Sequence, residues 1–411
     1  MRPLDPALDP ETAFAALRRP GAPALFFDGR GGHDGAWPCR LAIEPRLTPV
    51  PTLRDVDEIL ARRRAAGGPG GTGIALAASY EGGLTAVEVD ALIAFPPGSQ
   101  PVAIGRADLV ERAATALSRP FAPAPRGSTA VSGAPRTSLP REAYVRAVAR
   151  VLGHIERGDL YQANLTQRLE ARFDADAWDL YRAIGEATPA PRSAFVETSG
   201  WALASMSPEI FVDVSSAGSA ETRPIKGTRP RGATAASDAE AARELLASAK
   251  DRAELVMIVD VLRNDLGRIS RIGSVAVPEL CVLRSYAAVH HLVARVQASL
   301  VPGVTAGEIF AAVFPGGSIT GAPKERAIQR LHEIEPCPRG LYTGSLFWLD
   351  DDGSMASSIL IRSAVVADGR VHVGAGGGIV ADSDPEAEWS EANAKARALT
   401  RALGFEPEEA A

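Results

Sequence analysis

The feature that most constrains the fold is the order of helix-like and strand-like segments after residue 140. Segments with apolar residues at helical spacing alternate with runs in which apolar and polar residues alternate, and several of these runs come in adjacent pairs. Paired runs of this kind are typical of hairpins, and helices interleaved with hairpins favour antiparallel sheet. We therefore expect an α+β fold built mainly on antiparallel sheet.

The expected elements follow from periodicity and from glycine and proline stops. Helices are expected at about 53–66, 141–158, 238–266 (as one or two helices), 305–313, 323–333 and 385–403. Strands are expected at about 161–173, 272–283, 287–300, 341–349, 357–367 and 370–380.

The chain divides at residues 119–140, which are rich in proline, glycine, serine and arginine. Such a composition indicates a linker or a long surface loop. It separates an N-terminal part, residues 1–118, from a larger C-terminal part, residues 141–405. At 411 residues the whole chain is long enough to bury a large core.

Charge and composition narrow the classes of function. The formal net charge of −6 gives no general affinity for nucleic acid or for an anionic membrane. No signal-peptide pattern and no apolar run of ~20 residues is present, so we expect a cytoplasmic protein. The three cysteines, Cys39, Cys281 and Cys337, are far apart and indicate neither a disulfide framework nor a zinc site.

One short basic segment could carry chemistry. In TRPIKGTRPRG, residues 222–232, Lys226 lies among Arg223, Arg229 and Arg231. A solvated loop is the ordinary explanation of such a run. The alternative is a lysine whose pKa is lowered by burial and by neighbouring cations, which could act as a nucleophile or a base near neutral pH.

Acidic residues on two expected helices are candidate ligands for a cation. Glu254 lies in a helix with apolar residues on most sides, where a carboxylate needs either a salt bridge or a metal ion. Glu388, Glu391 and Lys395 lie at i, i+3 and i+7 of the last helix, after an Asp-Pro start. A surface salt bridge from Glu391 to Lys395 explains part of this pattern, and a Mg²⁺ site is the alternative.

Polar, glycine-rich and histidine-containing runs leave further alternatives open. The even residues of the strand at 161–173, among them Gln162, form a polar face that meets either solvent or a polar cavity. The glycines of FPGGSITGAP and VGAGGGIV make either tight turns or anion sites. His290 and His291 lie in a strand, and alternation places only one of them on the core side.

Several of these segments match one known family together. GDLYQANLTQRL, SMSPEIF, RPIKGTRPRG, ELVMIVDVLRNDLGR, VHHLVARV, FPGGSITGAPKERA, RGLYTGS, ILIRSA and GGGIVADSDPEAEWSEANAKA run in family order from about residue 140 to 400. They resemble the chorismate-utilising enzymes, which include component I of anthranilate synthase and of aminodeoxychorismate synthase and the isochorismate and salicylate synthases. The resemblance implies the anthranilate synthase component I-like sandwich of two packed, mainly antiparallel sheets with helices outside, to which the N-terminal part contributes.

The resemblance also implies a reaction. Lysine at the position of Lys226 is typical of the aminodeoxychorismate branch, whereas anthranilate synthases typically have alanine there. The lysine base of the isochorismate and salicylate enzymes aligns with Gln162. The implied activity is amination of chorismate at C4, through a covalent lysine intermediate, for p-aminobenzoate and folate synthesis. Anthranilate synthase component I and a non-catalytic chorismate-binding subunit are the alternatives.

Site roles carried over from the family complete the expectation. Lys226 is the implied nucleophile, Glu209 the acid for the leaving hydroxyl, and His291 a residue near the enolpyruvyl ether. Mg²⁺ is the implied cofactor, held by Glu254 and Glu391 with Glu388 close by. The implied substrate-binding residues are Gln162, Ser318, Thr320, Tyr342, Arg362, Gly376, Gly377, Gly378 and Lys395. No cysteine has the context of a glutaminase nucleophile, so a separate glutamine amidotransferase subunit is expected to supply ammonia.

Overall fold

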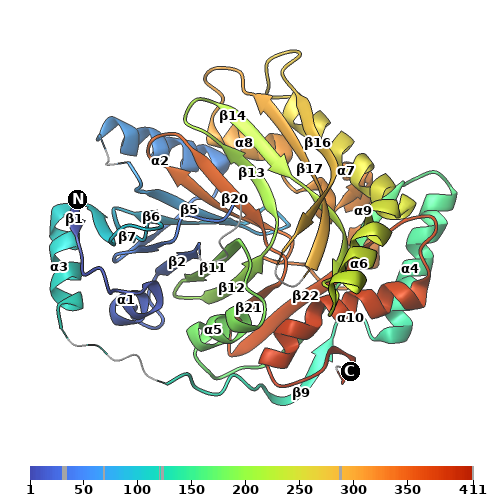
Figure 1. Cartoon of the computed structure of the whole chain (residues 1–411), viewed down its shortest axis with the longest axis horizontal. Coiled ribbons are helices and arrows are strands. Elements are labelled where there is room, and N and C mark those ends of the chain that lie inside the picture. Colours follow the sequence, from blue (N-terminus) through green and yellow to red (C-terminus); the bar gives the residue numbers. More distant parts are fainter. Residues whose placement is uncertain (30–34, 68–69, 120, 122–124, 287–288, 410–411) are drawn as a thin grey trace.

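The computed structural model describes residues 1–29, 35–67, 70–119, 121, 125–286 and 289–409. Two large sheets pack against each other and helices cover their outer faces (Figure 1). Every strand pair among these residues is antiparallel, which confirms the expected α+β class. Within the described ranges no helix is long and apolar enough to cross a membrane.

The larger sheet combines strands from both ends of the chain. In the described residues it has twelve strands. Their spatial order is β1 (Arg2–Pro3), β8 (Val102–Gly105), β7 (Ala91–Ala94), β3 (Arg40–Ala42), β2 (Ala24–Asp28), β11 (Arg192–Glu197), β12 (Trp201–Ser207), β21 (Ser363–Ala367), β22 (Arg370–Ile379), β10 (Gln162–Arg172) and β18 (Gly321–Ala322), with β9 (Ser132–Thr137) also paired to β10.

The smaller sheet is built in the same way. Among the described residues it has ten strands. Their order is β15 (Ile225–Pro230), β17 (Val289–Ser299), β14 (Ser219–Arg223), β13 (Ile210–Val214), β20 (Met355–Ile359), β19 (Ser345–Asp350), β5 (Gly73–Ala78), β6 (Leu84–Val89) and β4 (Arg46–Thr48), with β16 (Ala276–Ser285) paired to β17.

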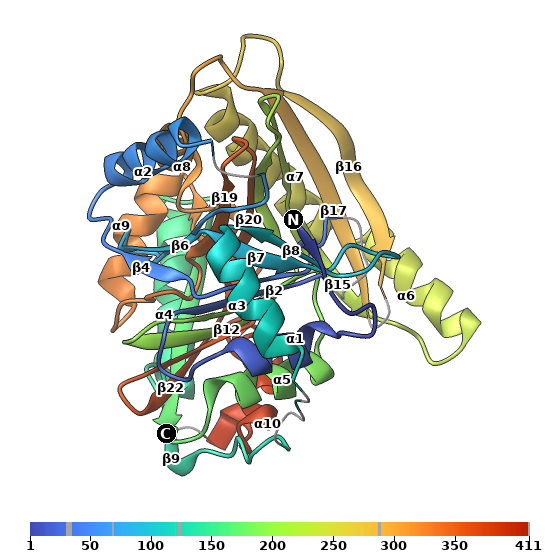
Figure 2. The same ribbon diagram turned by 90° about the vertical axis from the view of Figure 1, so that its left-hand side faces the viewer.

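The helices cover the two outer faces and one end of the body. The larger sheet packs its outer face against α1, α3, α5 and α10, and the smaller sheet against α2, α7 and α8. Helices α2 and α8 lie side by side (Figure 2). The bounds are α1 Pro10–Leu17, α2 Leu53–Ala65, α3 Ala107–Leu117, α4 Arg141–Glu156, α5 Ala177–Ala187, α6 Ala235–Ala247, α7 Ala249–Gly267, α8 Ala306–Val313, α9 Lys324–Ile334 and α10 Pro385–Ala402, with 3₁₀ turns at Gly317–Ile319 and Pro407–Glu409.

The layer between the sheets is apolar at the N-terminal side of the body. Side chains of β2 and β5 meet there with those of β19, including the buried Phe27 and Trp348, whose ring centroids are 5.6 Å apart. Residues 1–118 therefore supply strands to both sheets and share this core with the C-terminal part. The segment interpreted as a linker, 119–140, contains β9, and its residues 120 and 122–124 lie outside the described residues.

One expected strand is wrong in a way that matters for the site. The run 357–367 forms two strands, β20 in the smaller sheet and β21 in the larger one, so the chain crosses between sheets at residues 360–362. Arg362 has a positive φ of 51° at this crossing. The pattern did not reveal the break, because two short buried strands in succession look like one long strand, although Arg362 and Ser363 interrupt the apolar residues there.

One expectation on α7 needs correction, and the alternation expected on β17 leads to burial on both of its faces. Helix α7 is not buried nearly all round, since Val256 is 46% exposed and only one side packs on the smaller sheet. His290 and His291 are both buried, because helices cover one face of β17 and the interior of the body covers the other. Strand β17 begins at Val289, and positions 287–288 of the expected strand lie outside the described residues.

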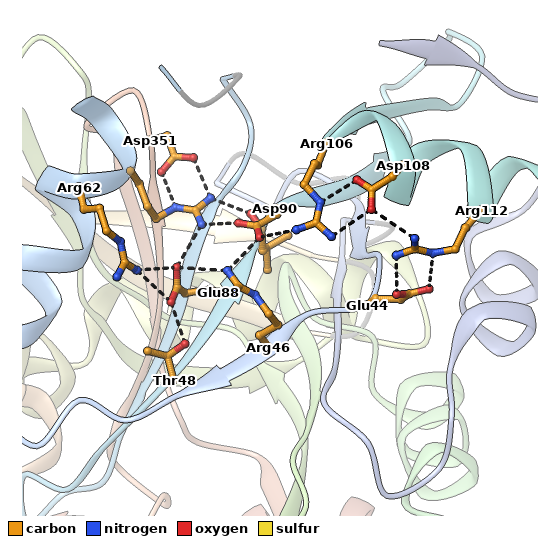
Figure 3. Close-up of polar contacts among 12 residues, drawn as sticks. Glu44, Arg46, Thr48, Arg62, Glu88, Asp90, Arg106, Asp108, Arg112 and Asp351 are labelled. Atoms are coloured by element: carbon orange, nitrogen blue, oxygen red, sulfur yellow. Dashed lines mark hydrogen bonds and ion pairs between the residues drawn. The ribbon is translucent and has the colours of Figure 1, made fainter. Parts of the chain in front are cut away.

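A chain of ion pairs ties the N-terminal helices to both sheets (Figure 3). Arg63 of α2 is its centre and reaches Asp351 at 2.8 Å and Asp90 at 2.7 Å, with Glu88 at 3.4 Å. The Arg63 side chain is 9% exposed and that of Asp351 is 1% exposed, so the pair is shielded from solvent. Arg106 and Arg112 extend the network to Asp108 of α3.

Candidate active site

Lys226 lies on the edge strand β15 of the smaller sheet, where a bulge interrupts the pairing with β17. Gly227 forms the bulge with a φ of +72°, and a Cβ there would come within 2.8 Å of Leu245 and 2.9 Å of Asp251. Only glycine fits this position without strain. The bulge leaves the Lys226 Nζ 3.4 Å from the carbonyl oxygen of Ser318, to which it donates.

The pKa of Lys226 is lowered mainly by burial, while the charges of Glu254 and Glu209 oppose the shift. Among nearby cations, Lys395 adds most to the lowering. The three arginines of the basic segment are instead paired with carboxylates, as Arg223–Glu221, Arg229–Asp251 and Arg231–Asp238. The segment is therefore more than a solvated loop, and burial, rather than crowding by arginine, is the main cause of the shift.

Glu209 lies next to Lys226 and is 5% exposed. Its Oε1 accepts a hydrogen bond from the Ser318 Oγ at 3.0 Å. Burial raises the pKa of this carboxyl to about 7, although Lys226 and the Ser318 hydroxyl both favour the ionised form. A carboxyl with such a pKa can donate a proton at neutral pH.

Arg362 and His291 lie on the same side of the site. Arg362 forms no hydrogen bond or ion pair through its side chain with any described residue, and burial lowers its pKa. Its charge and burial together lower the pKa of His291 to about 4, with burial the larger cause. His291 is therefore neutral at pH 7 and shares a hydrogen bond of 2.9 Å with the Thr228 hydroxyl. A buried guanidinium without a carboxylate partner is suited to hold an anionic group of a ligand.

The polar face of β10 meets the glycines of β22. Gln162 is fully buried, and neither atom of its side-chain amide has a hydrogen-bond partner among the described residues. A Cβ at Gly378 would lie 2.3 Å from the Gln162 Nε2 and 3.6 Å from the Lys226 Nζ. The polar face therefore lines the interior beside Lys226 rather than solvent, and glycine at 378 leaves room for the Gln162 amide.

In the described part of the chain, the glycine-containing end of β22 also leaves backbone groups without a strand partner on one edge. Strand β21 pairs with β22 only as far as Val373, so the edge of Gly374–Ile379 that faces away from β10 has no strand partner among the described residues. The Gly376 carbonyl on this stretch accepts a hydrogen bond from the Lys395 Nζ at 3.1 Å. Glu388 also approaches it, since a Cβ at Gly377 would lie 3.2 Å from the Glu388 Oε2.

The predicted acidic residues are brought together from α7 and α10. The pKa of Glu254 is raised mainly by burial and also by the charge of Glu388. Burial acts to raise the pKa of Glu391 too, but Lys395, 2.8 Å away, outweighs it and lowers the value. The Glu388 Oε1 accepts a hydrogen bond of 2.6 Å from Ser383. The Glu391–Lys395 salt bridge is thus confirmed, inside a larger group of charges.

These carboxylates fit the donor chemistry of Mg²⁺. The described residues contain no group of three or more His, Cys, Asp or Glu side chains arranged to hold a metal ion by themselves. Mg²⁺ usually takes only one or two carboxylates and completes its shell with water and substrate oxygens. Burial is the main cause of the raised pKa of Glu254, and the charges of Lys226 and Lys250 oppose it.

The remaining predicted residues lie around this centre. Thr320 is fully buried, but its hydroxyl donates to the Gly316 carbonyl at 2.9 Å and is turned toward its own loop. The ring of Tyr342 packs directly on Gly374, and burial raises the pKa of its hydroxyl.

A cavity of about 110 Å³ adjoins Tyr342, with Arg168, His372 and the loop 335–341 in its lining. Neither Lys226 nor Glu209 lines that cavity, so chemistry rather than cavity size places the candidate site at Lys226.

A family model described as chorismate binding enzyme matches residues 103–401. The chain belongs to the chorismate-binding enzymes. Aminodeoxychorismate synthase component 1 of Klebsiella aerogenes is 45% identical over 256 residues, which cover 62% of this chain and 56% of that protein. Anthranilate synthase component 1 of Pseudomonas aeruginosa is 42% identical over 270 residues, or 66% and 55% of the two chains. The match thus spans little more than half the length of these curated relatives.

Solved structures of chorismate-binding enzymes share the fold. Anthranilate synthase component I from Streptococcus pneumoniae superposes with a TM-score of 0.76 at 26% identity, over 94% of this chain and 91% of that one. The menaquinone-specific isochorismate synthase of Escherichia coli gives a TM-score of 0.80 at 18% identity, over 98% of this chain and 92% of that one. The expected sandwich architecture of the family is therefore confirmed over nearly the whole chain.

Sequence reasoning missed residues that support the candidate site. Lys250 of α7 lies 3.7 Å from the Glu388 carboxylate, and its i,i+4 spacing to Glu254 was the available signal. Arg339 is 7% exposed, forms a two-pronged pair with Glu335, and donates to the Asn164 carbonyl of β10. Glu335 lies only four residues before Arg339, but the contact with β10 could not be predicted, because Asn164 is 175 positions away in the sequence.

Proposed function

We propose that this chain is component I of an aminodeoxychorismate synthase, which converts chorismate and ammonia to 4-amino-4-deoxychorismate. The observation that carries the proposal is the buried pair of Lys226, with a lowered pKa, and Glu209, with a pKa raised to about 7. A neutral amine and a protonated carboxyl side by side are the two reactive forms that the reaction needs. Relatives of that name at 42–45% identity support the assignment.

In the first step the Lys226 amine attacks C2 of chorismate. A C–N bond forms at C2, both ring double bonds shift by one position, and the C4–O bond breaks. Glu209 gives its proton to the departing hydroxyl, which leaves as water. The ammonium formed on Lys226 returns one proton to the Glu209 carboxylate, so charge and proton number balance.

In the second step ammonia attacks C4 from the face opened by the departed hydroxyl. Both ring double bonds shift back and the C2–N bond to Lys226 breaks, which regenerates the amine. The product keeps its enolpyruvyl ether and gains an amino group at C4. Glu209, again protonated, supplies the proton that the leaving amine takes up, and the ammonium on C4 gives one back.

The cations and the backbone amides around Lys226 and Glu209 would orient the substrate. Chorismate carries two carboxylates, and the unpaired Arg362 guanidinium with Tyr342 is suited to one of them. Lys395 and the open edge of Gly376–Gly378 are suited to the other. Glu254 and Glu391, with Glu388 close by, would hold Mg²⁺, which when bound neutralises the ring carboxylate. His291, neutral and held by Thr228, can donate or accept a single hydrogen bond at the enolpyruvyl ether.

A separate glutamine amidotransferase would supply the ammonia. Cys281 lies within strand β16, and Cys39 and Cys337 lie in loops before β3 and after α9. None of the three has the strand–turn–helix elbow that activates a glutaminase cysteine. The route of the product into p-aminobenzoate and folate is part of the same proposal.

The test is to incubate the chain with chorismate, Mg²⁺ and ammonium chloride and to identify products by mass and absorbance. A product that has exchanged a hydroxyl for an amino group and kept the enolpyruvyl group supports the proposal. Anthranilate with release of pyruvate would assign the chain to the anthranilate branch, to which it is also 42% identical. Chorismate binding without turnover would indicate a non-catalytic subunit.

A further inference from the structure

The chain uses lysine very sparingly. It has 44 lysine and arginine residues, of which only four are lysine. Lys324 forms a shielded ion pair of 2.5 Å with Asp265, near the C-terminal end of α7. The other three, Lys226, Lys250 and Lys395, all interact with the carboxylates of the candidate site. Arginine supplies almost all the remaining basic side chains, and three of the four lysines lie in this one cluster.

Lys250 is the member of this cluster without an assigned role. Its Nζ lies 3.7 Å from the Glu388 Oε1, and its charge also lowers the pKa of Glu254 and of Glu391. It is a single cation shared by all three carboxylates that would face Mg²⁺. The Glu388 side chain is 5% exposed, but that of Lys250 is 47% exposed, so Lys250 reaches the group from the solvent side.

Lysine and arginine would behave differently at this position. An ammonium is a compact charge on a flexible stem, and a contact of 3.7 Å with one oxygen is a loose ion pair. A guanidinium would form two parallel hydrogen bonds with Glu388 and hold it in place. A cation that must leave a carboxylate easily is therefore better supplied by lysine.

We propose that Lys250 is a tethered counter-ion that occupies the carboxylate group in the free protein and is displaced when a divalent cation binds. The proposal rests on the magnesium site of the proposed function. It makes Lys250 a positioning residue: it keeps Glu254, Glu388 and Glu391 together against their mutual repulsion, and it sets the affinity for the divalent ion by competing with it.

The experiment is titration of the chain with Mg²⁺ alone, at constant ionic strength and without chorismate, followed by calorimetry. K250M removes the competing charge and keeps the length of the side chain, so Mg²⁺ affinity should rise about two- to fivefold, the range for a half-exposed ion pair. K250R should bind Mg²⁺ about two- to fivefold more weakly than the parent. Arg252 is exposed two positions away, and R252M is the control that removes the same charge without contact to Glu388.

The outcomes separate this inference from the magnesium site itself. If K250M binds Mg²⁺ no more tightly than the parent, or if R252M shows the same gain in Mg²⁺ affinity, the proposal that Lys250 competes with the divalent cation is wrong. A parent chain that binds no Mg²⁺, or binds it equally well after E254Q and E391Q, would overturn both the competition and the proposed metal site. A gain in K250M that E391Q abolishes supports both.

Discussion

The raised pKa of Glu209 leads to a prediction about stability that is independent of any activity assay. Replacing Glu209 with glutamine keeps the shape of the side chain and its contact with Ser318 but removes the ionisation. E209Q should therefore lose the part of the pH dependence of folding that this buried carboxyl causes. It should also abolish the reaction, because glutamine cannot give a proton to the leaving hydroxyl.

The magnitude follows from the pKa values. The folded-state pKa is about 7 against an ordinary 4.5, a difference equivalent to about 3 kcal/mol. Below pH 4.5 the carboxyl is protonated in both the folded and the unfolded state, so its ionisation does not change the free energy of unfolding. Between pH 4.5 and 7 the unfolded chain ionises first, so the parent loses stability as pH rises, and the loss is complete above the folded-state pKa.

The assay is urea unfolding of parent and E209Q at several pH values from 4.5 to 8. The stability of E209Q relative to the parent should rise by about 3 kcal/mol across this range. E244Q, at an exposed position of α6, is the matched control and should show no such trend. A difference between E209Q and parent that stays constant with pH would refute the assignment of a raised pKa to Glu209, and with it the role of this residue as the acid.

Three further substitutions test the network, the anion site and the space beside Lys226. R63M leaves the shielded Asp351 unpaired and should lower the free energy of unfolding by about 3–5 kcal/mol, whereas R54M, at an exposed i,i+4 pair, should change it by less than about 1 kcal/mol. R362M should raise the KM for chorismate about 10- to 100-fold with stability kept within about 1 kcal/mol, because no described carboxylate loses a partner; a large loss of stability would contradict this. G378A places a methyl group 2.3 Å from Gln162 Nε2 and should reduce kcat/KM at least tenfold, in contrast to G200A, where a Cβ meets nothing within 4 Å.

Much of the fold was accessible from local pattern. Helix α10 begins as predicted, with the Asp384 side chain capping the Ala387 amide and Pro385 in the first turn. The strand at 162–172 and the helices at 53–65 and 141–156 also match, because periodicity and stop residues are local properties. The crossing between sheets at Arg362 was missed, since nothing in the pattern of residues 357–367 tells which sheet each half joins.

The candidate site shows a similar division. Resemblance and residue type brought Lys226, Glu209 and the three glutamates forward, and the structure gathers them in one region. Burial was one of the two expected causes of the lysine's lowered pKa, but the contribution of Lys395 was not predictable, because Lys395 is 169 positions away in the sequence. The polar face of β10 left solvent and cavity open as alternatives, and only the burial of Gln162, Asn164 and Thr166 in the folded chain decides for the interior.

The most direct test of the account is a search for the covalent intermediate on Lys226. The chain is mixed with chorismate and Mg²⁺ in the absence of ammonia, quenched, and measured by intact-protein and peptide mass spectrometry, with K226A alongside. The account predicts a mass increase equal to chorismate less one water, located on the peptide that contains Lys226 and absent from K226A. Conversion of chorismate by ammonia at an unchanged rate in K226A, with no adduct in the parent, would contradict it.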